Sequence, residues 1–221
     1  MSRKLDRQKA LKLRLKGKSY SQIKEALNVS KSTLSLWLKS YPLTKDQINS
    51  LRGKNPKRIE KFRETMRLKH ESRLKTVYDK KMKTLLPLTN KELLVAGLFL
   101  YWGEGSKTTG NVSINNTDLD VLKFTLFWFC NVLKIPKDKI KVNLHLYKDM
   151  NPQQEIKFWS NCLKIPTSQF TKPYIKSSNR ENLTHKGFGH GTCGLAVHKI
   201  HIKEQIMMSI KAISDHYSSK I

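Results

Sequence analysis

Residues 20–38 read YSQIKEALNVSKSTLSLWL, and this stretch decides the fold of the amino-terminal part of the chain. Its apolar residues are spaced so that two short helices can cross and share a small core. Asn28 stands at the turn between them, where the backbone is expected to be left-handed and where Asn is tolerated better than most residues. Ser30 then predicts the N-cap of the second helix. The expected core residues are Ile23, Leu27, Val29, Leu34 and Trp37.

The same stretch resembles the helix-turn-helix of bacterial regulators, recombinases and transposases. Lys24 departs from that pattern, which has a small residue there, so the helix crossing is expected to open slightly. The alternative is an ordinary helical hairpin with an apolar seam. In the helix-turn-helix interpretation, short polar or basic groups point outward from the second helix and reach base edges or phosphates: Lys31, Ser32, Thr33 and Ser35.

The composition favours a nucleic acid as the partner. The 221 residues carry 43 Lys and Arg against 17 Asp and Glu, a formal net charge of +26 with a pI near 10.1. Such a charge on a folded chain most often binds the phosphate groups of a nucleic acid, although charge alone does not distinguish DNA from RNA. Residues 1–90 hold 25 of these basic and 7 of the acidic side chains, so this part, with a net charge of +18, is the main electrostatic contact.

No segment predicts membrane insertion or export. The longest apolar run, residues 93–102, has ten residues and is too short to cross a bilayer. The first residues carry no signal-peptide pattern, and three cysteines without a close pair fit a reducing compartment. We therefore expect a cytoplasmic, nucleoid-associated protein with no membrane partner.

Breaks in the pattern predict three segments: a helix-turn-helix domain at residues 1–42, a basic helical connector at 43–89 and a larger domain at 90–221. Residues 57–83 contain no Gly or Pro and are rich in helix formers, which predicts a long helix. Two interpretations of this helix stay open: it lies along DNA, or it is a solvated link between domains. Pro87 cannot continue it, and Thr89 or Asn90 can cap the next helix.

The third segment mixes helical and strand patterns, which predicts an α+β domain. Helices are expected at residues 93–102, 118–133, 153–163 and 203–214, and strands at residues 112–115, 140–147, 170–176 and 192–200. Segments 127–142 and 158–173 both contain Phe-Trp followed by Leu-Lys-Ile-Pro, at offsets of 31 and 30 residues. This repeat suggests two related helix–strand units in one sheet.

The strand at residues 140–147 has one apolar face and one face of basic and hydrogen-bonding groups. On the polar face, Lys141, Asn143, His145 and Tyr147 are expected to read the major groove. Further candidate DNA contacts on the preceding segments are Lys107, Ser113 and Asn115.

The segment LVAGLFLYWGEGSK at residues 94–107, followed by VSINNTDLDVLKF at 112–124, resembles the start of a LAGLIDADG homing-endonuclease domain. The resemblance covers residues 91–216. It implies an antiparallel, saddle-shaped sheet with helices on one side and a polar face that lies in the major groove. It also implies a homodimer, because two motif helices pair in that family. Phe99 and Trp102 depart from the motif, which has Gly and Asp at these places.

The resemblance further implies catalysis. Glu104 takes the place of the catalytic acid and would hold Mg²⁺ against the scissile phosphate. Its position at the end of an apolar helix, where the helix dipole disfavours a carboxylate, independently suggests a cation at this point. Lys148, at the end of the clearest strand, is a candidate to lie near the same phosphate. The expected function is site-specific binding of double-stranded DNA with Mg²⁺-dependent cleavage.

Other interpretations stay open. The same parts resemble sporulation regulators that have lost the nuclease acids, so a non-catalytic transcriptional regulator is the alternative, and an RNA-binding factor is a third. The pairs His190/Cys193 and His198/His201 suggest zinc only weakly, because four residues separate them and strand alternation sends Cys193 and His198 to opposite faces. The Gly-rich stretch at 187–191 is a weak signal for a phosphate cradle.

Overall fold

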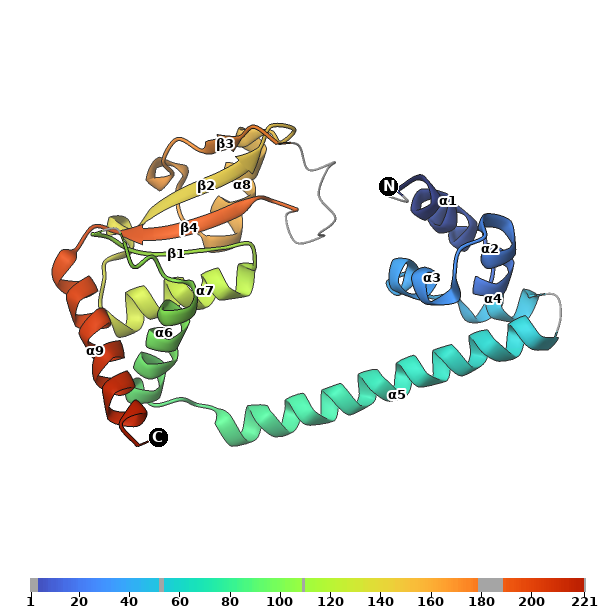
Figure 1. Ribbon diagram of the computed structural model, residues 1–221, viewed down its shortest axis with the longest axis horizontal. Coiled ribbons are helices and arrows are strands. Elements are labelled where there is room, and N and C mark those ends of the chain that lie inside the picture. Colours follow the sequence, from blue (N-terminus) through green and yellow to red (C-terminus); the bar gives the residue numbers. More distant parts are fainter. Residues whose placement is uncertain (1–3, 52–53, 109, 179–188, 221) are drawn as a thin grey trace. The chain divides into compact units, whose positions relative to one another are not determined.

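The computed structural model describes residues 4–51, 54–108, 110–178 and 189–220. The chain divides into two compact units, Met1–Leu86 and Pro87–Ile221, which Figure 1 shows in one view. The first unit is all helical and the second is α+β. No helix in the described ranges is long and apolar enough to cross a membrane.

Three short helices form the core of the first unit: α1 (Lys4–Leu15), α2 (Tyr20–Leu27) and α3 (Lys31–Leu38). Each packs against the other two. Three of the five expected core residues are buried, whereas Leu27 and Trp37 are only partly buried at the margin. Leu38, which is not among the expected core residues, is fully buried. The shared core therefore consists of Ala10, Tyr20, Ile23, Val29, Leu34 and Leu38.

The turn between α2 and α3 has the expected geometry. Asn28 has a φ of 49° and lies in the left-handed region. The Ser30 hydroxyl accepts the Thr33 amide at 3.1 Å and caps α3. Upstream, Ser19 and Gln22 form a capping box at the start of α2. Local signals thus fix both helix starts and the turn that sets their crossing.

Two further helices complete the first unit. The short α4 (Lys45–Ser50) precedes α5 (Lys54–Leu85), which is continuous for 32 residues and about 48 Å long. The long helix predicted at residues 57–83 is thereby confirmed. Its early turns pack against α4 and bury Glu60. From residue 68 to its end, every side chain of α5 is exposed within this unit.

The second unit is a four-stranded sheet with helices: α6 (Asn90–Glu104), α7 (Leu119–Phe127), α8 (Pro152–Leu163) and α9 (Ile200–Ser218). Thr89 and Asn90 are the two candidates for the N-cap of α6. Thr89 is the cap, and it forms a capping box with Glu92. The helix expected at 118–133 continues beyond α7 as a π-helical turn, η1 (Trp128–Val132). The strands are β1 (Val112–Asn116), β2 (Lys141–Tyr147), β3 (Tyr174–Lys176) and β4 (Thr192–Val197).

The strand order is β1-β4-β2-β3, and the sheet is mixed. β4 pairs antiparallel with both β1 and β2, but β3 pairs parallel with β2. The prediction of a purely antiparallel sheet is therefore wrong. The physical reason is α8, which carries the chain back across the sheet between β2 and β3, and such a crossover makes neighbouring strands parallel.

The internal repeat explains that crossover. In each copy a helical segment with a buried Trp, Trp128 or Trp159, ends at Leu-Lys-Ile-Pro, and a 3₁₀ turn and a strand follow. Lys134 and Lys164 occupy the same left-handed position, with φ of 55° and 52°. The two related helix–strand units in one sheet are thus confirmed.

All the helices of the second unit cover one face of the sheet (Figure 1). The apolar residues of the strands point to that side and are buried, and α6, α7 and α9 contact β1 or β4 there. The buried apolar residues on that side are Val112, Ile114, Val142, Leu144, Leu146, Cys193, Leu195 and Val197. The opposite face carries the polar members of each strand, as alternation requires.

Candidate nucleic-acid interface

The outward side of α3 is polar and basic. Lys31, Ser32 and Ser35 are exposed as expected, and Thr33 is half-buried. The Ser30 hydroxyl lies 2.8 Å from both the Ser32 and the Thr33 hydroxyls, so the first turn carries a small hydroxyl cluster. Hydroxyls and a Lys ammonium at the start of a recognition helix can bond base edges and phosphates.

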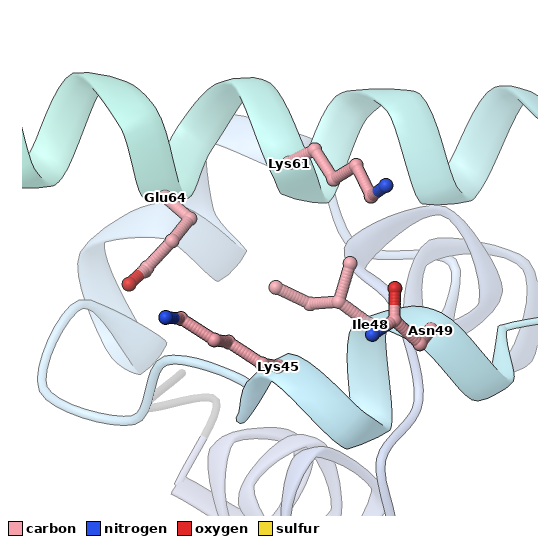
Figure 2. Close-up of a pocket in the computed structure, with 5 residues that line it drawn as sticks. All are labelled: Lys45, Ile48, Asn49, Lys61 and Glu64. Carbon is pink, nitrogen blue, oxygen red and sulfur yellow. The ribbon is translucent and has the colours of Figure 1, made fainter.

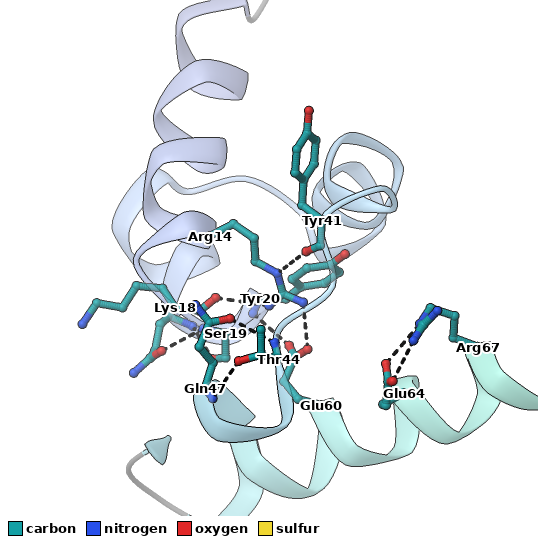
Figure 3. Close-up of polar contacts among 11 residues, drawn as sticks. Arg14, Lys18, Ser19, Tyr20, Tyr41, Thr44, Gln47, Glu60, Glu64 and Arg67 are labelled. Atoms are coloured by element: carbon teal, nitrogen blue, oxygen red, sulfur yellow. Dashed lines mark hydrogen bonds and ion pairs between the residues drawn. The ribbon is translucent and has the colours of Figure 1, made fainter. Parts of the chain in front are cut away.

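A buried ion pair ties α1 to α5 and supports the helix-turn-helix (Figure 3). Arg14 Nη2 lies 3.0 Å from Glu60 Oε2, and the two side chains are only 4% and 3% exposed. Arg14 also donates to the carbonyls of Tyr41 and Lys18, while Glu60 Oε1 accepts the Tyr20 amide. The Arg14 guanidinium and the Glu60 carboxylate thus both form hydrogen bonds beyond their own ion pair. A buried ion pair needs such bonds to offset the cost of desolvation.

Two guanidinium groups lie over the ring of Tyr20. Arg14 and Arg63 lie 4.5 Å and 3.9 Å from the centroid of its ring. Burial raises the pKa of Tyr20, and the charges of the two arginines oppose that rise. The ring therefore stays neutral and gives both cations a favourable π face.

A groove of about 250 Å³ runs between α4 and α5, and Figure 2 shows its lining. Lys45, Ile48 and Asn49 line it from α4, and Lys61 and Glu64 line it from α5, with the Lys45 ammonium pointing toward the Glu64 carboxylate. The hydrogen bond from Arg67 holds the pKa of Glu64 below its ordinary value, and the charge of Lys45 adds to the effect. Glu64 is therefore ionised and already engaged by cations, so the groove does not offer a free carboxylate to a ligand.

In the second unit, the candidate DNA contacts of β1 and β2 lie together on the uncovered face of the sheet. The register places Ser113 opposite Ala196 and Lys141 on the other side of it. One step along, Asn115 and Asn143 flank Gly194 in the same way. Lys141 is exposed, whereas Ser113, Asn115, Asn143 and His145 are half-buried.

Gly194 lets the two asparagine amides meet across the central strand. Asn143 Nδ2 donates to Asn115 Oδ1 at 3.2 Å. A Cβ on Gly194 would lie 1.9 Å from Asn115 Oδ1 and 2.4 Å from Asn143 Oδ1. Asn143 Oδ1 is buried without a hydrogen-bond partner in the described residues. The pair is thus a fixed amide platform in the middle of the polar face.

At the far end of β2, His145 and Tyr147 are more enclosed. Burial lowers the pKa of His145, the nearby charge of Lys176 lowers it further, and its ring centroid lies 5.5 Å from that of Tyr174. Tyr147 is only 4% exposed, with the Lys176 ammonium 4.9 Å from its ring centroid. Burial leaves Tyr147 little surface for a direct base contact, while His145 presents a neutral imidazole.

Glu104 is the exposed last residue of α6. Gly105 then bridges Ile114, and the Ser106 amide donates to the Ser113 carbonyl at 2.9 Å, so the chain joins the β1 edge of the sheet. The Ser106 carbonyl accepts from the Tyr101 hydroxyl and from the nearly buried Lys203 ammonium. These bonds fix the turn that carries Glu104 and the exposed Lys107.

The structure does not bring Lys148 to Glu104. The paired register puts Gly105 level with Ile114, Leu195 and Val142, whereas Lys148 lies six residues beyond Val142. Six residues of strand span about 20 Å, and β4 also lies between β1 and β2. The two residues therefore cannot share one phosphate within a chain. Among the described residues, no three His, Cys, Asp or Glu side chains gather to hold a metal ion.

The weaker zinc interpretation gains no support from the geometry. Cys193 is fully buried in the apolar core, and burial raises the pKa of its thiol. His190 instead lies 2.8 Å from Glu155 and stacks on Phe158, with ring centroids 3.5 Å apart. Residues 187 and 188 of the Gly-rich stretch lie outside the described residues.

Sequence reasoning missed Leu36. It is 74% exposed and lies on the outward side of α3, one turn after Ser32. The helical repeat alone could have found it, because it stands opposite Leu34 and Leu38. It was missed because only polar residues were considered as DNA contacts.

Comparison with known proteins finds a match for residues 1–45 only. A family model described as a homeodomain-like domain matches residues 1–45. No curated protein and no solved structure matches the chain. The match covers α1, α2 and α3, and together with their geometry it identifies a helix-turn-helix, a domain that implies binding of double-stranded DNA.

Proposed function

We propose that this protein binds double-stranded DNA at specific sites, with α3 in the major groove. The observation that supports this most directly is the helix-turn-helix geometry of residues 1–45, with the exposed Lys31, Ser32 and Ser35 on α3. The network around Arg14 and Glu60 holds the three helices to α5. A rigid support of this kind keeps the reading side chains in register with the bases.

The charge distribution supports the same proposal. The net charge of +18 on residues 1–90 suits a phosphate backbone, and the exposed lysines and arginines in the second half of α5 are part of it. Phosphate contacts supply affinity and position but carry no sequence information. In this account α5 strengthens binding, and α3 selects the site.

The polar face of the sheet provides a second DNA contact in this account. Its hydrogen-bonding groups lie on neighbouring strands, and the helices leave this face uncovered. Lys141 would contact a phosphate, and the amides of Asn115 and Asn143 would face base edges. No carboxylate side chain belongs to the described strands of this face, which favours an anionic partner.

DNA cleavage is a narrower proposal, and it requires a second copy of the chain. Glu104 offers one exposed carboxylate, and Mg²⁺ is usually held by one or two carboxylates together with substrate phosphates. When bound, Mg²⁺ would supply positive charge at the phosphodiester. The residues of one chain fit this role only as a single ligand, because Lys148 of the same chain lies too far from Glu104 to share its phosphate.

The exposed apolar side of α6 suggests how two copies would meet. Phe99 and Trp102 are 50% and 43% exposed, and their ring centroids lie 5.7 Å apart on α6. Pairing of two α6 helices through these rings would bury them and bring two Glu104 residues to one interface. Sedimentation of the wild type and of Trp102→Ala tests this pairing, because a dimer that persists in the variant contradicts it.

One experiment separates the possible functions. The full chain is incubated with random double-stranded DNA, bound duplexes are selected and sequenced, and the selected site is then offered with Mg²⁺. A consensus that is cut, with cutting lost in Glu104→Gln while binding stays, supports the nuclease. A consensus that is bound but not cut supports a non-catalytic regulator. If no consensus emerges, or if single-stranded RNA binds better, the proposal of site-specific DNA binding is wrong.

A further inference from the structure

Leu36 lies on the side of α3 opposite the core of the amino-terminal unit. With about 100° per residue, Leu36 lies roughly 160–200° around the helix from the buried Leu34 and Leu38. Ser32 lies one turn before it on the same stripe and is also exposed. An isolated exposed leucine is common on protein surfaces. Its position on the helix is therefore the informative feature.

Two other sides of α3 face neighbouring elements of its own unit. Leu34 and Leu38 pack against α1 and α2. Ser35 and Lys39, on a flank of the helix, border a groove of about 290 Å³ that α5 closes on its other side. The stripe of Ser32 and Leu36 is exposed and lies away from both the shared core and this groove.

The surroundings of Leu36 suit DNA better than another protein. Residues 26–45 contain no Asp or Glu, while Lys31 and Lys39 lie within five residues of Leu36. A single leucine among hydroxyls and lysines is a poor core for a protein interface, which needs about 800 Å² on each side. In the major groove, however, one base presents an apolar group, the 5-methyl group of thymine.

We propose that Leu36 contacts the 5-methyl group of a thymine in the target site and so selects that base. This inference rests on the proposed function, since it requires that α3 enter the major groove. Ser32 lies one turn away, and its hydroxyl can form a hydrogen bond with the neighbouring base either as donor or as acceptor. The pair would thus read one apolar and one polar group on successive bases.

The test replaces each thymine of the selected site, one at a time, by deoxyuridine, which lacks only the methyl group. Burying one methyl group is worth about a fourfold change in affinity. We expect wild-type protein to lose about fourfold at one thymine of the selected site, and Leu36→Ala to bind the thymine and deoxyuridine duplexes equally. Leu15→Ala is the matched control, because Leu15 is 63% exposed on α1. This control should keep the fourfold difference.

The outcomes distinguish this inference from the proposed function. If a consensus is selected but every thymine tolerates deoxyuridine, or if the loss persists in Leu36→Ala, the role of Leu36 is wrong while DNA binding stands. If no consensus is selected, both proposals fail. Since Leu36 is exposed, the far-ultraviolet circular dichroism and the melting temperature of Leu36→Ala should match those of the wild type.

Discussion

Arg14 and Glu60 are 46 residues apart in the sequence, and their side chains meet at 3.0 Å in the interior of the amino-terminal unit. Arg14 belongs to α1 and Glu60 to α5, so this pair makes the beginning of the long helix part of the support for the helix-turn-helix. The packing of the helix-turn-helix thereby includes a residue outside the 45 that the homeodomain-like family model matches.

The first prediction concerns this pair. Glu60→Gln removes one charge and leaves Arg14 buried without its counterion, which should lower the free energy of unfolding by about 3–5 kcal/mol. Urea titration followed by circular dichroism measures the change. Glu71→Gln is the matched control, since Glu71 is an exposed partner of Arg67, and it should not move the midpoint. An equal effect of both variants would show that the buried pair has no special role.

The second prediction concerns Gly194. Gly194→Ala places a methyl group within 2.4 Å of both asparagine side-chain oxygens, so the amide pair must separate. We expect a loss of about 1–3 kcal/mol, measured by thermal unfolding. Gly103→Ala is the control, because a Cβ there meets nothing within 4 Å and Ala favours a helix by about 0.5–1 kcal/mol. Adding Asn115→Ala to Gly194→Ala should restore part of the stability, and a double variant no more stable than Gly194→Ala would contradict a steric clash with the amides.

How much of the fold was predictable differs between the two units. The helix-turn-helix could be read from Asn28, Ser30 and a few apolar spacings, because turns and caps are local signals. The parallel pairing of β2 with β3 is non-local, yet the Leu-Lys-Ile-Pro repeat contained its signal: two copies in the same order run in the same direction across a sheet. The contact between Arg14 and Glu60 left no sequence pattern that singles it out.

The candidate sites show the same division. Strand alternation was enough to put Lys141, Asn143 and His145 on one face, since the period of two is a property of the backbone. It could not place Lys148 relative to Glu104, because that distance depends on strand order. Nor could it show that Tyr147 is buried, because its burial depends on tertiary packing rather than on alternation.

The third prediction concerns pH. Burial and then Lys176 lower the pKa of His145 from its ordinary value of 6.5, so the folded state disfavours the charged imidazole. Between the folded-state pKa and about 6.5 the unfolded chain binds more protons, so stability should fall as the pH drops below about 6.5. His145→Asn should reduce this pH dependence of the unfolding free energy. A nuclear magnetic resonance titration that gives His145 a pKa above 6.5 would reverse the sign and contradict this account.

The fourth prediction concerns the second half of α5. Lys75, Lys80 and Lys83 are exposed on its polar side. If they contact phosphates, replacing all three by Gln should flatten the plot of log affinity against log salt by about 0.9 for each phosphate that is no longer neutralised. The control replaces Lys123, Lys157 and Lys211, on the helices of the second unit, and makes the same change in net charge. Equal slopes for the two triple variants would make α5 a solvated link.

The most direct measurement for the central claim, that α3 selects the DNA site, is the ratio of affinities for the selected duplex and for a scrambled duplex at one fixed salt concentration. Ser32→Ala removes one base-reading hydroxyl and no charge, so this account predicts that the ratio falls about tenfold while the affinity for scrambled DNA stays the same. Leu15→Ala should leave both affinities unchanged. A Ser32→Ala protein with an unaltered ratio would contradict the claim and place site selection outside α3.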